Sequence, residues 1–268
     1  MKQYVRFFQS ALVALAVVVC ATAAAAQTSD DDQEPPAAHV ELLPRSTFLL
    51  SAEHISGENV MFVWDMNFGG ALDVIDYGAG RATFLANYQA ILGDEIRHFD
   101  PNQGNYILSG TASLRTRGVE VAGVFYHQSR HLADRDNRVA VAWNMAGVRL
   151  ERAVTTGRAH IDGRVDVRGV VARAFVDYTW EIEGAVRSDV QIRPAVAVLF
   201  AGTLRRLGVD DSQNRGDQTG FRGETGVRFE GRRGAMEFFL AAERRIDPSP
   251  LQFGTARWVS VGFRLLSR

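Results

Sequence analysis

The chain has 268 residues, of which 46% are hydrophobic and 23% charged, and its 30 basic side chains nearly balance 31 acidic ones. This balance excludes a generic basic nucleic-acid-binding protein, and the apolar content excludes a mostly disordered chain. The composition includes 25 Gly and 10% aromatic residues but only 7 Pro, which favours sheet over a helical bundle.

The first 26 residues have the pattern of an export signal. Lys2 and Arg6 form a short basic region, an apolar run covers residues 11–19, and a small-residue stretch ends at Ala26. A signal peptidase cuts after such a stretch, so we expect cleavage after Ala26. The cleavage would remove Cys20, the only cysteine, and with it any thiol chemistry.

Residues 27–45 are predicted to be a disordered acidic linker, because they are acid-rich at their start and show little hydrophobic periodicity. From about residue 46 onward, apolar residues recur at every second position, which is the period of a β-strand. In residues 159–168, for example, Ala, Ile, Gly and Val alternate with His, Asp and Arg. The sequence therefore predicts one all-β domain over residues 46–268.

This alternation fits either a soluble β-sandwich or a transmembrane β-barrel. The predicted strands have about 10–13 residues, the length that a tilted strand needs to cross a bilayer. Tight turns at residues 78–80, 117–118 and 231–234 alternate with longer polar loops at residues 94–104, 132–138, 207–218 and 246–252. Short turns at one rim and long loops at the other favour a single antiparallel barrel in the bacterial outer membrane.

The expected number of strands is twelve, with ten as the alternative. Eleven segments can be counted back from the C-terminus, among them residues 158–168, 172–183 and 188–204, and residues 46–54 supply the twelfth. The apolar phase flips at residues 168–172 without a long loop. The segment 258–268 resembles the last strand that outer-membrane proteins present to the barrel-assembly machinery, although it ends in Arg268 instead of an aromatic residue.

One segment, Tyr126–Leu132, carries candidate chemistry. Period two places His127, Ser129 and His131 on the lipid-facing side near a rim. A His beside a Ser can act as the base that activates a nucleophile in acyl transfer, provided that an acid orients the His. The nearby acids are Asp134 and Asp136 in the following loop.

The His-x-Ser pattern of this segment resembles that of lipid A 3-O-deacylases, which implies a lipid-directed acyl-ester hydrolase that uses His127 and Ser129. The whole segment also resembles uncharacterised outer-membrane proteins that carry Tyr-His-x-Ser-Ser-His-Leu before an acidic loop. Arg130 replaces the second Ser here, and this resemblance implies no activity. The alternative is a polar strand end that anchors the rim.

Charged residues of both signs are predicted to point into the barrel, which favours a mutually paired network that mostly plugs the lumen. A selective pore would concentrate one sign at a constriction. The expected function is thus a structural, binding or narrow-channel barrel, with the hydrolase as the alternative. The predicted lumen residues are Arg164, Asp166, Arg168, Arg173, Asp177, Glu181, Arg222, Glu224, Arg228 and Glu230.

The sequence predicts no cofactor and no metal. His127 and His131 lie four residues apart, which on a strand separates them by about 13 Å, too far to share one ion. The expected partners are outer-membrane lipid and lipopolysaccharide, together with the barrel-assembly machinery during biogenesis. No nucleic acid is expected as a partner.

Overall fold

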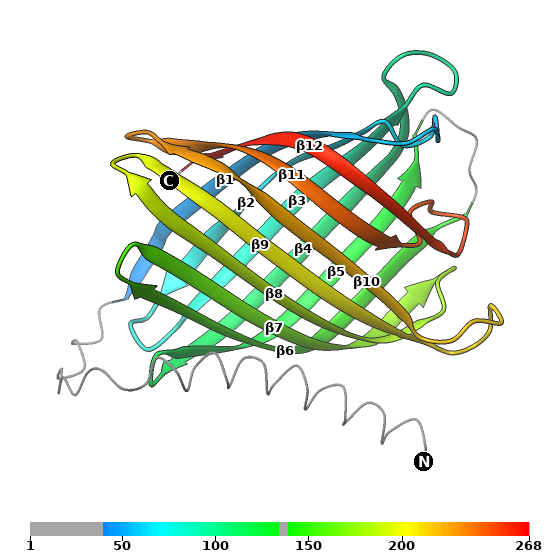
Figure 1. Cartoon of the computed structure of the whole chain (residues 1–268). Coiled ribbons are helices and arrows are strands. Elements are labelled where there is room, and N and C mark those ends of the chain that lie inside the picture. Colours follow the sequence, from blue (N-terminus) through cyan, green and yellow to red (C-terminus); the bar gives the residue numbers. More distant parts are fainter. Residues whose placement is uncertain (1–39, 134–138, 268) are drawn as a thin grey trace.

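The computed structural model describes residues 40–133 and 139–267 of the chain. The predicted signal peptide, the first part of the predicted linker, Asp134 and Asp136 lie outside the described residues. The described strands form a closed antiparallel barrel in which each strand pairs with its neighbours in sequence and β1 pairs with β12 (Figure 1). The prediction of a twelve-stranded all-β barrel is confirmed, and the alternative of ten strands is wrong.

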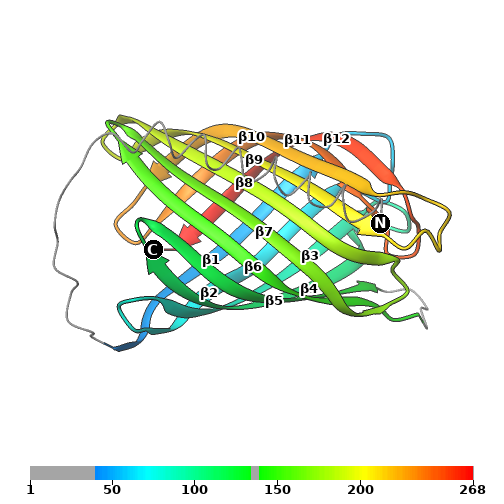
Figure 2. The same cartoon turned by 90° about the horizontal axis from the view of Figure 1, so that it is seen from below.

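The strands have 13 to 17 residues and are inclined to the barrel axis, as Figures 1 and 2 show. At about 3.3 Å per residue this length suffices to cross a bilayer at a tilt. Their bounds are β1 Glu41–Ile55, β2 Trp64–Asp76, β3 Arg81–Gly93, β4 Asp100–Thr116, β5 Val119–Leu132, β6 Val141–Thr156, β7 Ala159–Ala174, β8 Tyr178–Arg193, β9 Val196–Val209, β10 Gln218–Glu230, β11 Gly234–Ile246 and β12 Thr255–Ser267.

The predicted bounds were wrong in the region of β7, β8 and β9. The expected strands 172–183 and 188–204 each run across a turn, at residues 175–177 and 194–195. β7 instead continues through residues 168–172, where its register with β6 shifts. Such a bulge moves the following side chains to the other face without ending the strand. Phe175 and Ala195 take positive φ in the two turns, so no Gly marked them. β1 also begins earlier than residue 46.

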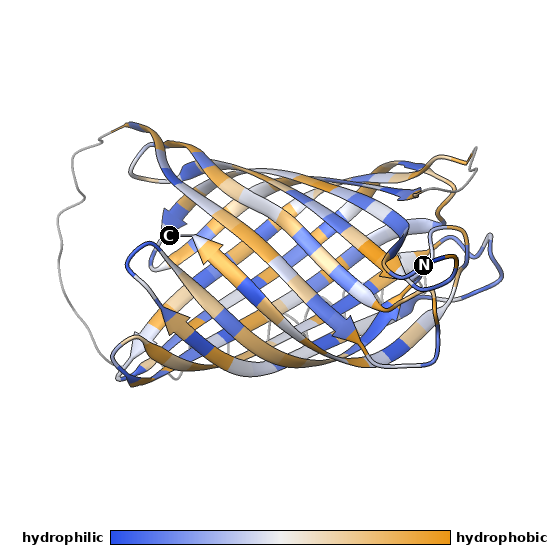
Figure 3. Cartoon of the chain, turned by 90° about the horizontal axis from the view of Figure 1, so that it is seen from above, coloured by the Kyte–Doolittle hydropathy of each residue, from blue (hydrophilic) through white to orange (hydrophobic). Residues whose placement is uncertain are grey.

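The outer wall of the barrel is apolar over its middle. Large side chains that alternate with inward residues are widely exposed on it, and Figure 3 shows the alternation as hydrophobic and hydrophilic bands along the strands. A soluble protein rarely exposes apolar surface of this extent, whereas a lipid-embedded barrel requires it. Examples from around the wall are Phe68, Phe84, Leu108, Phe125, Val186, Phe200, Leu240 and Val261.

In residues 40–133 and 139–267, no helix is long and apolar enough to cross a membrane.

The barrel has two different ends. Both ends of the described chain, together with the short turns, lie at one end, which we call the turn end (Figure 1). The longer connections, including residues 94–99, 210–217 and 247–254, lie at the other, which we call the loop end. Inside the loop end, side chains from several strands pack into an apolar cluster formed by Val141, Trp143, Met145, Val176, Tyr178, Leu207, Val209 and Ile246.

Candidate functional site

A polar site lies on the outer wall, where β5 and β6 pair. His127 and Ser129 alternate with inward residues on β5 and share the face of Phe125, which is 51% exposed. The register pairs His127 directly with Asn144 of β6, and directly opposed side chains lie on the same face of a sheet. Nδ1 of His127 lies 2.7 Å from Oδ1 of Asn144.

The hydrogen bond between His127 and Asn144 gives His127 a side-chain partner that the sequence alone did not predict. An amide oxygen can only accept, so the contact makes Nδ1 of His127 the protonated nitrogen. Nε2 of the neutral ring is then free to take a proton, as a general base requires. Sequence reasoning missed Asn144 because it is an amide instead of an acid and lies on the next strand, where only the register between β5 and β6 brings it to His127.

The Ser129 hydroxyl lies between two imidazoles along β5. Its Oγ is 3.4 Å from Nε2 of His131, and His127 is two residues before it on the same face. The His131 ring meets the ring of Tyr106 edge-on, with 5.5 Å between the centroids, and Tyr106 in turn lies 5.0 Å from Tyr88. The site is therefore bordered by aromatic residues toward β3 and β4, and it lies close to the loop end of β5.

The even-numbered residues of the same segment point into the barrel, where Arg130 makes contacts that hold the fold together. The buried Arg130 guanidinium donates to the carbonyl oxygens of Asp247 and Pro248, each at 2.6 Å, and to the Gln103 side chain at 3.0 Å. These contacts hold the connection 247–254 against the inside of β4 and β5. Arg130 thus belongs to the closure of the barrel and has no part in the outer-wall site.

Asp247 is the centre of that closure. Its carboxylate accepts hydrogen bonds from the Tyr178 hydroxyl at 2.7 Å and from both terminal nitrogens of Arg215 at 2.7 and 2.8 Å. Arg215 also donates to Asp177. Burial alone would lower the pKa of the Arg215 guanidinium, but its hydrogen bonds to Asp177 and Asp247 raise that pKa above its ordinary value. The connections 210–217 and 247–254 are thereby tied across the loop end.

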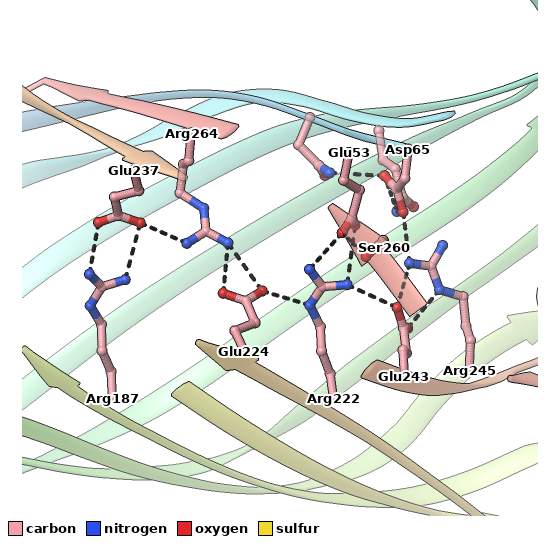
Figure 4. Close-up of polar contacts among 12 residues, drawn as sticks. Glu53, Asp65, Arg187, Arg222, Glu224, Glu237, Glu243, Arg245, Ser260 and Arg264 are labelled. Carbon is pink, nitrogen blue, oxygen red and sulfur yellow. Dashed lines mark hydrogen bonds and ion pairs between the residues drawn. The ribbon is translucent and has the colours of Figure 1, made fainter. Parts of the chain in front are cut away.

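A chain of ion pairs, which we call the central network, crosses the lumen between β8, β10, β11, β12 and the first two strands (Figure 4). Glu237, which is 0% exposed, accepts from Arg187 at 2.7 Å, Arg228 at 2.6 Å and Arg264 at 2.8 Å. Arg222 bonds Glu53 and Glu224. The members are Glu53, Asp65, Arg187, Arg222, Glu224, Arg228, Glu230, Glu237, Glu243, Arg245 and Arg264.

A second set of ion pairs lies on β6 to β9. Arg164 bonds Glu183 and Arg168 bonds Glu181, while Asp166 accepts from Arg149 at 2.8 Å. Arg205 joins Glu181 from the next strand. The structure thus brings four of the predicted lumen residues into this set and four others, Arg222, Glu224, Arg228 and Glu230, into the central network.

The remaining two predicted lumen residues lie at the loop end: Arg173 pairs with Asp210, and Asp177 with Arg215. The predicted lumen residues did not include Glu53 and Asp65, which the structure places in the central network. The lumen keeps a cavity of about 850 Å³ whose lining includes Arg45, Arg115, Glu151 and His160. These residues belong to the turn-end halves of their strands, and the lining also includes Arg187, Arg222 and Arg264, so the cavity lies beside the networks.

Within the described ranges, no group of three or more His, Cys, Asp or Glu side chains is placed to hold a metal ion.

No protein-family model matches the chain, and no curated protein matches its sequence. Solved structures do match. An active-site variant of outer membrane phospholipase A from Escherichia coli is 12% identical with a TM-score of 0.51, over 90% of this chain and 95% of that one. The KdgM porin is 5% identical, with a TM-score of 0.48 over 83% of this chain and 98% of that one. LpxR from Salmonella typhimurium is 8% identical, with a TM-score of 0.48 over 82% and 99%. The phospholipase likeness shows that this chain has the fold of an outer-membrane β-barrel.

Proposed function

We propose that this barrel hydrolyses acyl esters of outer-membrane lipids, with Ser129 as the nucleophile, His127 as its base and Asn144 as the orienting group. The observation that carries the proposal is the 2.7 Å contact between His127 and Asn144, beside Ser129, on the lipid-facing wall. A base held by a third side chain next to a hydroxyl is the arrangement that nucleophilic acyl transfer uses.

The proposed reaction has two steps. Ser129 Oγ attacks the ester carbonyl carbon while Nε2 of His127 takes the hydroxyl proton, and the imidazolium then passes that proton to the departing alcohol. A water molecule, deprotonated by the same nitrogen, then attacks the acyl-serine carbonyl carbon; the ester bond to Ser129 breaks, Nε2 returns the proton to Ser129 Oγ, and the fatty acid is released. For the first step the Ser129 hydroxyl turns from His131 toward His127. Catalytic contacts are often loose without substrate and tighten when it binds.

The position of the site favours a lipid as the substrate. The Ser129 side chain points to the outer wall instead of the lumen. It lies in the third of β5 that is nearest the loop end, and exposed apolar residues such as Phe125 and Val148 lie on the turn-end side of it. At this height an ester carbonyl of a lipid in the outer leaflet would meet the hydroxyl. One protein of similar fold is named a phospholipase A, and phospholipid and lipid A are the two ester classes that we propose.

The test is to supply the purified protein with phospholipid in one assay and lipid A in another, and to identify released fatty acids by mass spectrometry. We expect the wild-type protein to release fatty acid from one of the two substrates. The Ser129→Ala variant, folded to the same extent, should release none. Absence of release from both substrates, or equal release by wild type and Ser129→Ala, would contradict the proposal.

A second candidate is a structural barrel without a conducting lumen. It is favoured by the closure of the loop end, where Arg130, Arg215 and Asp247 tie two connections over an apolar cluster. Twelve strands leave little bore once arginines and glutamates enter it, whereas open porins use 16–18 strands. We expect no large stable conductance in planar bilayers. A wild-type conductance like that of a general porin would contradict a closed loop end.

The same recordings show whether the tied connections at the loop end block the lumen, or whether the charged side chains inside a narrow bore do so. Removing the Arg215 and Arg130 side chains together should release the connections 210–217 and 247–254, and we expect channel events to appear. Arg233→Ala at the turn end is the control, because its side chain is exposed on a short turn. Silent bilayers for all variants would show that the ion-pair networks alone close the lumen.

A further inference from the structure

Three arginines lie together on the outer wall near the loop end, on strands other than those of the hydrolase site. Arg206 of β9 shares the outward face of Leu204, which is 58% exposed. Arg244 of β11 pairs directly with the outward Phe221 of β10 and, on its other side, with Arg257 of β12. The register therefore places the three arginines on one face.

Two of the guanidiniums converge on one residue. Arg206 Nη1 lies 3.4 Å from the Thr219 hydroxyl, and Arg244 Nη1 donates to the Thr219 carbonyl oxygen. The neighbouring acid is Asp217, whose carboxylate lies 3.3 Å from Arg206 Nη2. We call Arg206, Arg244 and Arg257 the arginine cluster; together with Asp217 the three arginines carry an excess of two positive charges.

The arginine cluster is costly in the isolated protein. Like charges directly opposite each other on neighbouring strands are destabilising, and Arg244 faces Arg257 in this way. Within residues 40–133 and 139–267, the buried Nε atoms of Arg206 and Arg244 have no hydrogen-bond partner, and a buried donor without a partner also costs free energy. The Arg206 side chain is 41% exposed, and an anion that accepts from exposed guanidinium nitrogens of the three arginines would offset the repulsion between Arg244 and Arg257.

The depth of the cluster indicates which anion. The next outward residues toward the turn end are Leu204, Phe221, Ala242 and Val259, all exposed and apolar. The arginines thus lie at the upper edge of the apolar band, where lipid headgroups meet the hydrocarbon. A guanidinium fork matches phosphate oxygens in two parallel hydrogen bonds.

We propose that Arg206, Arg244 and Arg257 bind a phosphate group in the headgroup of an outer-leaflet lipid. The cluster is separated from the His127 site by β7 and β8 on one side and by β1 to β4 on the other. The bound lipid is therefore distinct from a lipid at Ser129, and the proposal does not depend on the hydrolase. The bound lipid neutralises the positive charge of the arginine cluster and fixes the depth at which β9 to β12 lie in the membrane.

The test measures binding to the folded, full-length mature protein in neutral detergent. The probes are bisphosphorylated lipid A, the same lipid without its phosphates, phosphatidylglycerol and inorganic phosphate. We expect the double variant Arg244→Gln with Arg257→Gln to bind a phosphate-bearing lipid about 25-fold more weakly, at about five-fold for each arginine near a membrane surface. The matched control is Arg232→Gln with Arg233→Gln on the turn end, whose affinity should stay unchanged.

If the double variant does not assemble, the salt dependence of lipid binding by the wild-type protein provides the test. Binding of the phosphate-bearing lipid should weaken as salt is raised, because exposed charges are screened. Tighter binding of lipid A or of phosphatidylglycerol identifies the source of the phosphate, and either supports the site. Equal affinity for the lipid without phosphates, an affinity that the double variant leaves unchanged, or equally tight binding of inorganic phosphate would overturn the proposal.

Discussion

Replacing His127 by Ala is expected to lower kcat/KM for lipid ester hydrolysis by at least about 10³-fold, because loss of the base leaves the Ser129 hydroxyl protonated. His131→Ala is the matched comparison, since both imidazoles flank Ser129 on the same face. His131 contacts Tyr106 through its ring edge and has no amide that fixes its tautomer among its described contacts. We expect less than about a ten-fold loss for His131→Ala. Fatty-acid release from mixed micelles measures both variants.

The role of Asn144 is tested by two further substitutions. Asn144→Ala removes the acceptor 2.7 Å from Nδ1 of His127, and we expect a loss of about 10²-fold because the imidazole then samples other orientations. Asn144→Asp keeps an oxygen at the same position and should retain more activity than Asn144→Ala. Activity that survives His127→Ala but not His131→Ala would assign the base to His131 and give the Asn144 contact a purely structural role.

Removing the Glu237 carboxylate is expected to be the most destabilising single change in the lumen. Glu237→Ala leaves Arg187, Arg228 and Arg264 without their shared acceptor inside the barrel. Breaking a buried pair by deleting one partner costs about 3–5 kcal/mol, since the remaining charge stays desolvated. Each of these arginines keeps a second carboxylate, Asp189, Glu230 or Glu224, so we expect the lower end of this range.

Glu230→Ala provides the control for Glu237→Ala. Both carboxylates bond Arg228, but the Glu230 side chain is 27% exposed whereas that of Glu237 is 0% exposed. Partly exposed pairs contribute about 0–1 kcal/mol. Urea unfolding in lipid vesicles, followed by Trp fluorescence, compares the two free energies of unfolding. Equal losses would show that the central network is not stabilised by burial and that Glu237 is an ordinary ion-pair partner.

Much of the architecture was determined by the sequence itself. A strand has a side-chain period of two, so alternation identifies both the strands and the face on which each residue lies. That is why the number of strands and the inward direction of Arg164 or Arg222 could be predicted without a structure. Tight turns with Gly, such as residues 78–80, also gave reliable strand ends, because Gly readily takes the positive φ that they need.

Other features were decided only by tertiary structure. The partner of His127 depends on the register between β5 and β6, which places Asn144 directly opposite it. This register could not be predicted from the sequence. The bulge opposite Asn144 and Met145 reversed the faces within β7 and displaced two predicted turns. Arg130 meets the carbonyl oxygen of Asp247 from 117 residues away. Local periodicity fixes the face of a side chain, but register and closure bring together distant segments, and these depend on the whole barrel.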